Sequence, residues 1–282
     1  MTIDPNLRIA SVHLAVSDLP RSLDFYERVL GLPSIAHSDE QARMGPDEEP
    51  AALLLSQIAG PTQPPGRSTG LFHVAWLHPS RAALADTVRR VAQAGWHFDG
   101  TADHGVSEAL YLSDPDGLGI EIYVDRPREQ WVRPRDGNGV EMVTLPLDVD
   151  DLLAQSPESP AAAMASGTVV GHVHMKVADV PHAHDFYRDA LGFEEQAMLP
   201  SAAFLSAGGY HHHVGLNSWQ SQGSTRAPDS APGLREVGFR LGSAEAIDTL
   251  AEQAAGTDSL TRESSERLSL RDPDGQLLSF SA

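Results

Sequence analysis

Histidine is the residue type in this chain best suited to hold a metal ion. The sequence contains 13 histidines and no cysteine, so thiolate sites, disulfides and cysteine nucleophiles are excluded. A metal would therefore be held by imidazole and carboxylate groups. Two of the histidines, His13 and His174, occupy equivalent places in a repeated segment, residues 13–31 and 174–192. Each copy of the repeat thus offers a potential metal ligand at its start.

The repeated segment indicates an internal duplication. Without a gap, the two copies share the histidine, a valine three residues later, an aspartate five residues later, a proline, an Asp-Phe-Tyr triplet and a closing Leu-Gly. Chance does not place so many identities in register, so the repeat fixes the architecture. A chain of 282 residues is long enough for two domains, each with its own core.

The predicted elements recur in the same order four times. In the first unit, an apolar strand at 9–16 precedes a helix that begins near Asp18 and ends at Gly31. Three more helices are predicted at 81–94, 181–191 and 244–255, and further strands at 51–55, 71–76, 109–112, 119–124, 172–177, 202–205, 210–216, 236–240, 268–270 and 277–280. Asp-Pro-Asp-Gly turns close two hairpins.

We therefore predict an α+β fold of four βαβββ modules. The modules would pair into two domains, 8–126 and 168–282, each a half-open, cup-shaped mixed sheet with helices outside. The segment between them, 127–167, is rich in Pro, Asp, Ser and Ala and is predicted to be a connection with one short helix near 149–153.

Charge and hydropathy restrict the partners of the chain. The formal net charge of −19 argues against nucleic acid and against an anionic membrane surface. The sequence shows neither an apolar run of the roughly 18 residues that a spanning helix needs nor a signal peptide at its start. We expect a cytoplasmic protein with a small-molecule substrate; a homo-oligomer is compatible with the sequence.

Four motifs in order carry a resemblance to a known family. They are His-x-x-Val-x-Asp-Leu, Phe-Tyr-x-x-x-Leu-Gly, Phe-His-Val and Asp-Pro-Asp-Gly-x-x-Ile-Glu-Ile, and together they cover nearly the whole chain. The chain resembles the vicinal oxygen chelate superfamily, which includes glyoxalase I, bleomycin-resistance proteins and type I extradiol dioxygenases. Residues 107–117 and 210–219 are similar to two-domain proteins of the catechol 2,3-dioxygenase type. The resemblance implies cups whose metal ligands project from the first and last strands of the modules.

In the N-terminal half, the resemblance selects His13, His73 and Glu121 as metal ligands. Two imidazoles and one carboxylate that leave open positions are typical of a non-haem ferrous centre. The resemblance also implies that Tyr111 hydrogen-bonds the substrate. His104, in the loop before it, is a candidate acid or base, or alternatively a hydrogen-bond donor to bound superoxide.

Two features of the N-terminal half depart from the family. Its two-domain extradiol enzymes normally carry the complete triad in the C-terminal domain. Their additional active-site histidine, on the last strand of the preceding module, has no counterpart in 51–56.

The C-terminal half offers an alternative metal site. His174 matches His13, but Glu236 stands in place of His73, and Ser279 in place of Glu121. His211 and His213 are predicted on one face of the last strand of the third module. His174, His213 and Glu236 would again supply two imidazoles and a carboxylate, and the sequence does not decide which cup works.

The resemblance implies a metal-dependent extradiol dioxygenase of aromatic catabolism, which cleaves a catechol-type substrate with O2. Fe(II) is the expected metal, and Mn(II), Ni(II) and Zn(II) are compatible with the ligands. Two alternatives stay open: a glyoxalase-type isomerase or lyase, and a metal-free protein that sequesters small molecules. No chemistry is assigned to His172, His182 and His184, which are expected at the surface or on helices.

Overall fold

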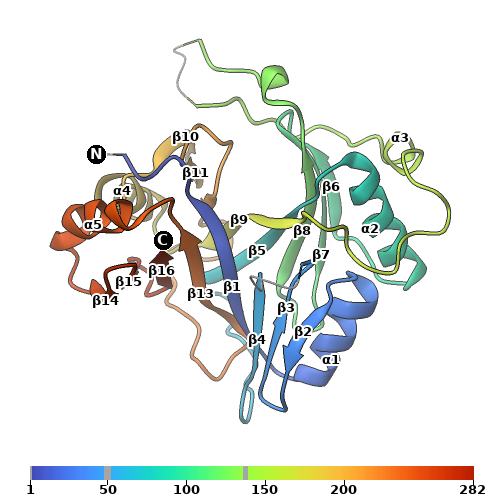
Figure 1. Ribbon diagram of the computed structural model, residues 1–282, viewed down its shortest axis with the longest axis horizontal. Coiled ribbons are helices and arrows are strands. Elements are labelled where there is room, and N and C mark those ends of the chain that lie inside the picture. Colours follow the sequence, from blue (N-terminus) through green and yellow to red (C-terminus); the bar gives the residue numbers. More distant parts are fainter. Residues whose placement is uncertain (1, 48–51, 136–138) are drawn as a thin grey trace.

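A computed structural model describes residues 2–47, 52–135 and 139–282 of the chain. The described residues form four modules of one helix and four strands, which confirms the predicted α+β class (Figure 1). The first two modules contain β1 (Arg8–Val16), α1 (Leu19–Asp24), β2 (Ser34–His37), β3 (Gln41–Met44) and β4 (Leu53–Gln57), then β5 (Gly70–Leu77), α2 (Arg81–Gln93), β6 (Gly100–Asp103), β7 (Ser107–Ser113) and β8 (Gly119–Asp125).

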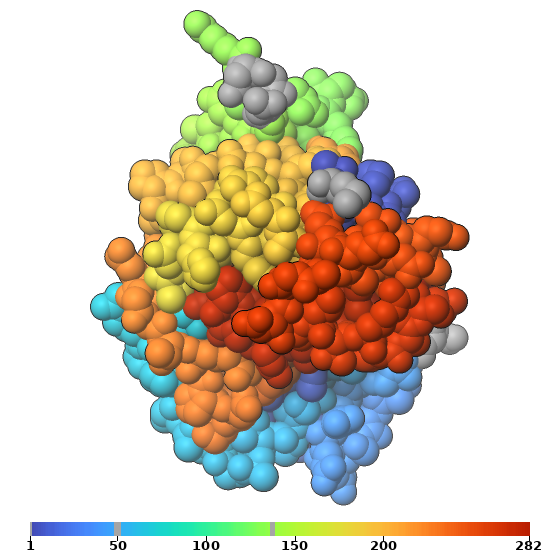
Figure 2. Space-filling model, turned by 90° about the vertical axis from the view of Figure 1, so that its left-hand side faces the viewer, coloured from blue at the N-terminus to red at the C-terminus, as the bar shows by residue number. Residues whose placement is uncertain are grey.

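The second half of the chain repeats this order. Its two modules contain β9 (Val169–Lys176), α4 (Val180–Asp185), β10 (Glu194–Leu199), β11 (Ala202–Ser206) and β12 (Val214–Asn217), then β13 (Gly233–Arg240), α5 (Ala244–Gln253), β14 (Thr261–Ser264), β15 (Arg267–Arg271) and β16 (Leu277–Ser281). Figure 2 shows these two modules stacked on one face of the molecule. The connection carries the predicted short helix, α3 (Val149–Leu153), and a 3-10 turn at Arg128–Gln130. A further 3-10 turn, Ala254–Gly256, follows α5.

Helices α1 and α4 begin in the same way, as the repeat predicts. The side chain of Asp18 accepts a hydrogen bond from the Arg21 amide, and Asp179 does the same for His182. Each helix continues as a π-helical turn, Phe25–Val29 and Phe186–Ala190.

The Asp-Phe-Tyr triplet of one module is hydrogen-bonded to the Asp-Pro-Asp-Gly turn of the next. The hydroxyl of Tyr26 donates to Asp114 in the first Asp-Pro-Asp-Gly turn (3.3 Å), and that of Tyr187 donates to Asp272 in the second (3.1 Å). The Asp-Phe-Tyr triplet therefore fastens the helix of one module to the hairpin turn of the next.

The modules that share a sheet are not the ones that the sequence led us to expect. One sheet runs β14-β15-β16-β13-β1-β4-β3-β2 and joins modules 1 and 4; the other runs β10-β11-β12-β9-β5-β8-β7-β6 and joins modules 2 and 3. The first strands pair antiparallel across the two halves, β1 with β13 and β5 with β9. Each cup is thus shared between the halves, and the domain boundaries at 8–126 and 168–282 stay a prediction.

Candidate metal centre

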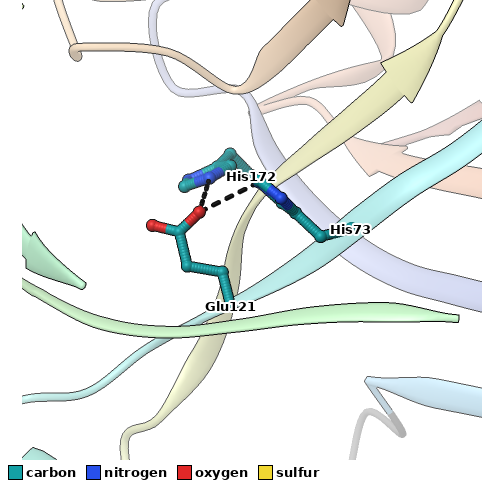
Figure 3. A group of neighbouring side chains, drawn as sticks. All are labelled: His73, Glu121 and His172. Atoms are coloured by element: carbon teal, nitrogen blue, oxygen red, sulfur yellow. Dashed lines mark hydrogen bonds and ion pairs between the residues drawn. The ribbon is translucent and has the colours of Figure 1, made fainter. Parts of the chain in front are cut away.

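Three buried side chains meet in the sheet of modules 2 and 3. His73 on β5, Glu121 on β8 and His172 on β9 each direct one possible ligand atom into a common space, and these atoms lie within 4.8 Å of one another (Figure 3). Nε2 of His73 is 2.9 Å from Oε2 of Glu121, and Nε2 of His172 is 3.1 Å from the same oxygen.

The strand register explains how these residues come together. Glu121 on β8 and His172 on β9 are both in register with Ala75 on the strand between them, β5. His73 lies two residues before Ala75 and therefore faces the same side of the sheet. The small side chain of Ala75, which is fully buried, leaves space between the glutamate and the histidine.

The charges of Glu121 and His172 suit metal binding. Burial lowers the pKa of His172 to about 4, so its imidazole is neutral near pH 7. Burial alone would raise the pKa of Glu121, but His172 and His73 hold it well below its usual value. Neutral imidazoles and an ionised carboxylate are the forms that bind metal ions.

An unsatisfied nitrogen supports the fit to a metal. Nε2 of His73 is buried and has no hydrogen-bond partner among the described residues, although Glu121 lies at ion-pair distance. An unmade hydrogen bond in the interior is costly. Ligand atoms about 2.1 Å from a metal lie about 3 Å apart when they are at right angles, and both imidazole nitrogens lie at about that distance from Oε2 of Glu121. The donor set therefore fits a metal ion.

Tyr111 and His104 lie next to this group. Tyr111 on β7 is in register with Glu121, and its hydroxyl is 2.8 Å from Nε2 of His104. Nδ1 of His104 is 2.7 Å from the carbonyl oxygen of Val143, to which it donates. Burial and the neighbouring Glu121 raise the pKa of Tyr111, so its phenol stays protonated.

Two more histidines complete the interior of the cup. The ring of His174 lies 5.0 Å from that of His73, and the ring of His212 lies 4.0 Å from that of His172. Burial lowers the pKa of both, and both rings are neutral. A side chain at Gly215 would meet the ring of His174 at 2.8 Å, so glycine is needed there.

The predicted N-terminal set is brought together only in part. His73 and Glu121 meet, but His13 lies on β1 in the other sheet, where its Nε2 is 2.9 Å from the hydroxyl of Ser56. The physical reason is that the first strand of module 2 pairs with that of module 3, not of module 1. His172 supplies the third donor in place of His13.

The alternative C-terminal set is dispersed. His174 lies beside His73, whereas Glu236 on β13 is in register with His13 and binds the hydroxyl of Ser279. His213 is not on the expected strand: β12 starts at Val214, and Nδ1 of His213 accepts a hydrogen bond from the amide of Ala207. These residues do not form one site.

Sequence reasoning missed His172 and His212. His172 is almost fully buried, contrary to the expectation for it; His184 is also buried, on α4, and His182 is exposed. The signal for His172 was its spacing, because residues two apart on a strand share a face and His174 was already a candidate. Module 3, not module 1, shares a sheet with module 2, so His212, and not a residue of 52–56, lies beside His172. Ala51 lies outside the described residues.

Comparison with known proteins places the chain in a family. The chain belongs to the Glyoxalase/Bleomycin resistance protein/Dioxygenase superfamily, whose model matches residues 8–122 and 169–280. It is 38% identical to a catechol-2,3-dioxygenase of Bacillus subtilis (strain 168), over 99% of both chains.

More distant relatives agree with this family. The chain is 27% identical to a lactoylglutathione lyase of Escherichia coli O157:H7, over 43% of this chain and 94% of that one. A solved structure from Bacillus subtilis subsp. subtilis str. 168 has a TM-score of 0.67 at 15% identity, and the match covers 100% of this chain and 86% of the other. That likeness shows the fold. Among the described residues, no helix is long and apolar enough to cross a membrane.

Proposed function

We propose that this protein is an extradiol dioxygenase that opens a catechol ring with O2 at the His73–Glu121–His172 site. The observation that carries the proposal is the buried group of two imidazoles and one carboxylate, with an unsatisfied nitrogen at its centre. The full-length relationship to a catechol-2,3-dioxygenase supports the choice of reaction.

We assign Fe(II) to the site, held by His73, Glu121 and His172. Two imidazoles and a carboxylate with open positions are typical of non-haem Fe(II) oxygenases, although Mn(II), Ni(II) and Zn(II) accept the same donors. When bound, Fe(II) would supply a positive charge for both oxygens of a catecholate and a route for electrons to O2.

Tyr111 and His104 would orient the diol and hold its proton. The phenol of Tyr111 stays protonated beside Glu121, so its single proton can turn from Nε2 of His104 to a catecholate oxygen when the substrate binds. His104 donates through Nδ1 to Val143, which leaves Nε2 as the acceptor for the Tyr111 hydroxyl. The pair can therefore pass a proton between the substrate and His104.

Aromatic side chains make an apolar wall beside these groups. The ring of Phe72 lies 5.2 Å from His174 and 5.3 Å from Trp219, and the ring of Phe204 lies 5.0 Å from His212. Such rings favour stacked or edge-on contact with another aromatic ring. A planar substrate of the catechol class suits this wall.

The similarity to the lactoylglutathione lyase of E. coli O157:H7 supports a second candidate function, an isomerase or lyase of the glyoxalase type.

The dioxygenase proposal is tested by measuring O2 uptake by protein that has been reconstituted anaerobically with Fe(II) and given catechol or alkylcatechols. The proposal expects stoichiometric O2 uptake with a yellow ring-opened product. Bound metal without O2 uptake would contradict it and favour the isomerase or lyase, and a protein that binds no metal would favour the sequestering protein.

A further inference from the structure

A line of hydrogen bonds runs from His212, beside the metal site, to Asp125 at the end of β8. Nδ1 of His212 is 2.8 Å from Nδ1 of His211, and Nε2 of His211 is 2.9 Å from Oδ1 of Asp125. His211 is fully buried. Asp125 is partly exposed and lies on the wall of a surface cavity of about 430 Å³ that Arg81, Glu108, Arg126 and Asp151 also line.

The carboxylate at the outer end sets the direction of the first hydrogen bond, and the tautomer of His211 sets the direction of the next. A carboxylate only accepts, so Nε2–H of His211 donates to Asp125. With its ring proton on Nε2, His211 presents Nδ1 as an acceptor, and Nδ1–H of His212 donates to it. The proton of His212 is thereby placed on Nδ1, and its Nε2 is left with a free lone pair. Nε2 of His212 has no hydrogen-bond partner among the described residues.

Strand β8 holds Asp125 in place for this task. Glu121, Tyr123 and Asp125 alternate along β8 and therefore share one face of the sheet. The hydroxyl of Tyr210 donates to Oδ1 of Asp125 (3.2 Å) and accepts from the hydroxyl of Tyr123 (2.8 Å). Oδ1 of Asp125, which accepts from His211, is thus held by a second donor. Asp125 lies on the same strand as Glu121, the carboxylate of the metal site.

We propose that Asp125 and His211 are positioning residues: they fix the ring orientation and the tautomer of His212, so that its Nε2 stays unprotonated beside the metal site. The inference rests on the proposed function for its catalytic consequence. Its structural part rests on the hydrogen bonds and on the 4.0 Å distance between the ring centres of His212 and His172. Without the carboxylate, the ring of His211 can turn or exchange its proton, and His212 loses the acceptor that fixes its tautomer.

Nitrogen-15 NMR of histidine-labelled, full-length protein loaded with diamagnetic Zn(II) tests the structural part directly. His212→Gln identifies the His212 signals. The inference expects His212 with its proton on Nδ1 in the parent protein and in Asp125→Asn, whose amide oxygen can still accept from His211. It expects a mixture of tautomers in Asp125→Ala. A His212 protonated on Nε2 in the parent, or unchanged in Asp125→Ala, would overturn the inference whether or not the protein cleaves catechol.

Kinetics of the Fe(II) protein test the consequence. Groups that orient the residues around a metal are typically worth about 10- to 100-fold in activity. Asp125→Ala should therefore lower kcat by about that factor, with KM for catechol within about twofold and the iron content unchanged, and Asp125→Asn should restore most of kcat. The control is Asp151→Ala, which removes an exposed carboxylate from the same cavity and should leave kcat unchanged.

A double variant separates positioning through His212 from any other effect. If Asp125 acts through His212, the substitution Asp125→Ala has no further effect on kcat in a His212→Ala background, because coupled residues are non-additive. A second loss of the same size in that background would refute the inference. Absence of ring cleavage in the parent protein would instead refute the proposed function, and the tautomer measurement would still decide the role of Asp125.

Discussion

Glu121 and His172 lie on strands at opposite sides of β5, and both are in register with the same residue of that strand, Ala75. One strand therefore sets the distance between a carboxylate from the first half of the chain and an imidazole from the second. The 3.1 Å between their ligand atoms follows from this shared neighbour and from its short side chain.

Ala75→Val should lower the affinity for iron without unfolding the sheet. Valine is favoured in strands, but its two methyl groups would enter the space between Glu121 and His172. Overpacking costs about 1–3 kcal/mol. Iron analysis and thermal unfolding check this: we expect less iron than in the parent and a moderately lower Tm. Ala42→Val, in a buried position of the other sheet, is the control and should lower the Tm alone. Full iron content in Ala75→Val would contradict the geometry.

Tyr111→Phe should lower kcat while iron stays bound. The substitution removes the hydroxyl that faces His104 and leaves the ring in place. A hydrogen bond to a charged group is worth about 1.5–3 kcal/mol, or about 10- to 100-fold in rate. Steady-state kinetics with catechol measure the loss.

Tyr187→Phe is the matched control for Tyr111→Phe. It removes a hydrogen bond to Asp272, which is not one of the residues of the site, so it should lower the stability by about 1 kcal/mol and spare kcat. Equal kcat values for the two variants would show that Tyr111 only packs.

His78 should make the protein less stable in acid. Burial lowers its pKa to about 4, and both ring nitrogens bind neighbours, the carbonyl of Trp76 and the hydroxyl of Thr87. Between pH 6.5 and 4 the unfolded chain holds a proton on His78 that the folded chain does not. Stability therefore rises with pH in this window, by up to about 1.4 kcal/mol per pH unit. The contribution of His78 to stability is therefore lost as the pH falls from 6.5 to 4.

Urea unfolding at several pH values checks the contribution of His78. The free energy of unfolding of His78→Gln should depend less steeply on pH than that of the parent, while His182→Gln, which changes an exposed histidine, should match the parent. An unchanged slope in His78→Gln would mean that His78 titrates normally in the folded protein.

The sequence was sufficient to predict the four modules, because the repeat, the helix caps at Asp18 and Asp179 and the hairpin turns are local signals. It did not predict which modules share a sheet. The first strands of all four modules carry similar apolar patterns, and pairing of β5 with β9 instead of β1 is decided by packing between residues far apart in the chain.

The site was half predicted for the same reason. His73 and Glu121 come from one module and were found together, whereas His172 comes from the other half of the chain. The loop at 207–213 could have been recognised: Gly208 and Gly209 both have positive φ, a conformation that ends a strand and favours glycine. Their presence places the three histidines that follow ahead of β12 and not on it.

The proposed metal site is tested most directly by comparing the iron content and catechol cleavage of His172→Ala with those of His13→Ala. Both histidines lie on the first strand of a repeat, but only His172 lies with His73 and Glu121. His172→Gln repeats the test with a side chain that fills more of the buried space, and thermal unfolding confirms that each variant folds. The His172 variants should lose most of their iron and activity, while His13→Ala should keep both. Loss of iron in His13→Ala with full iron in the His172 variants would contradict the proposed metal site.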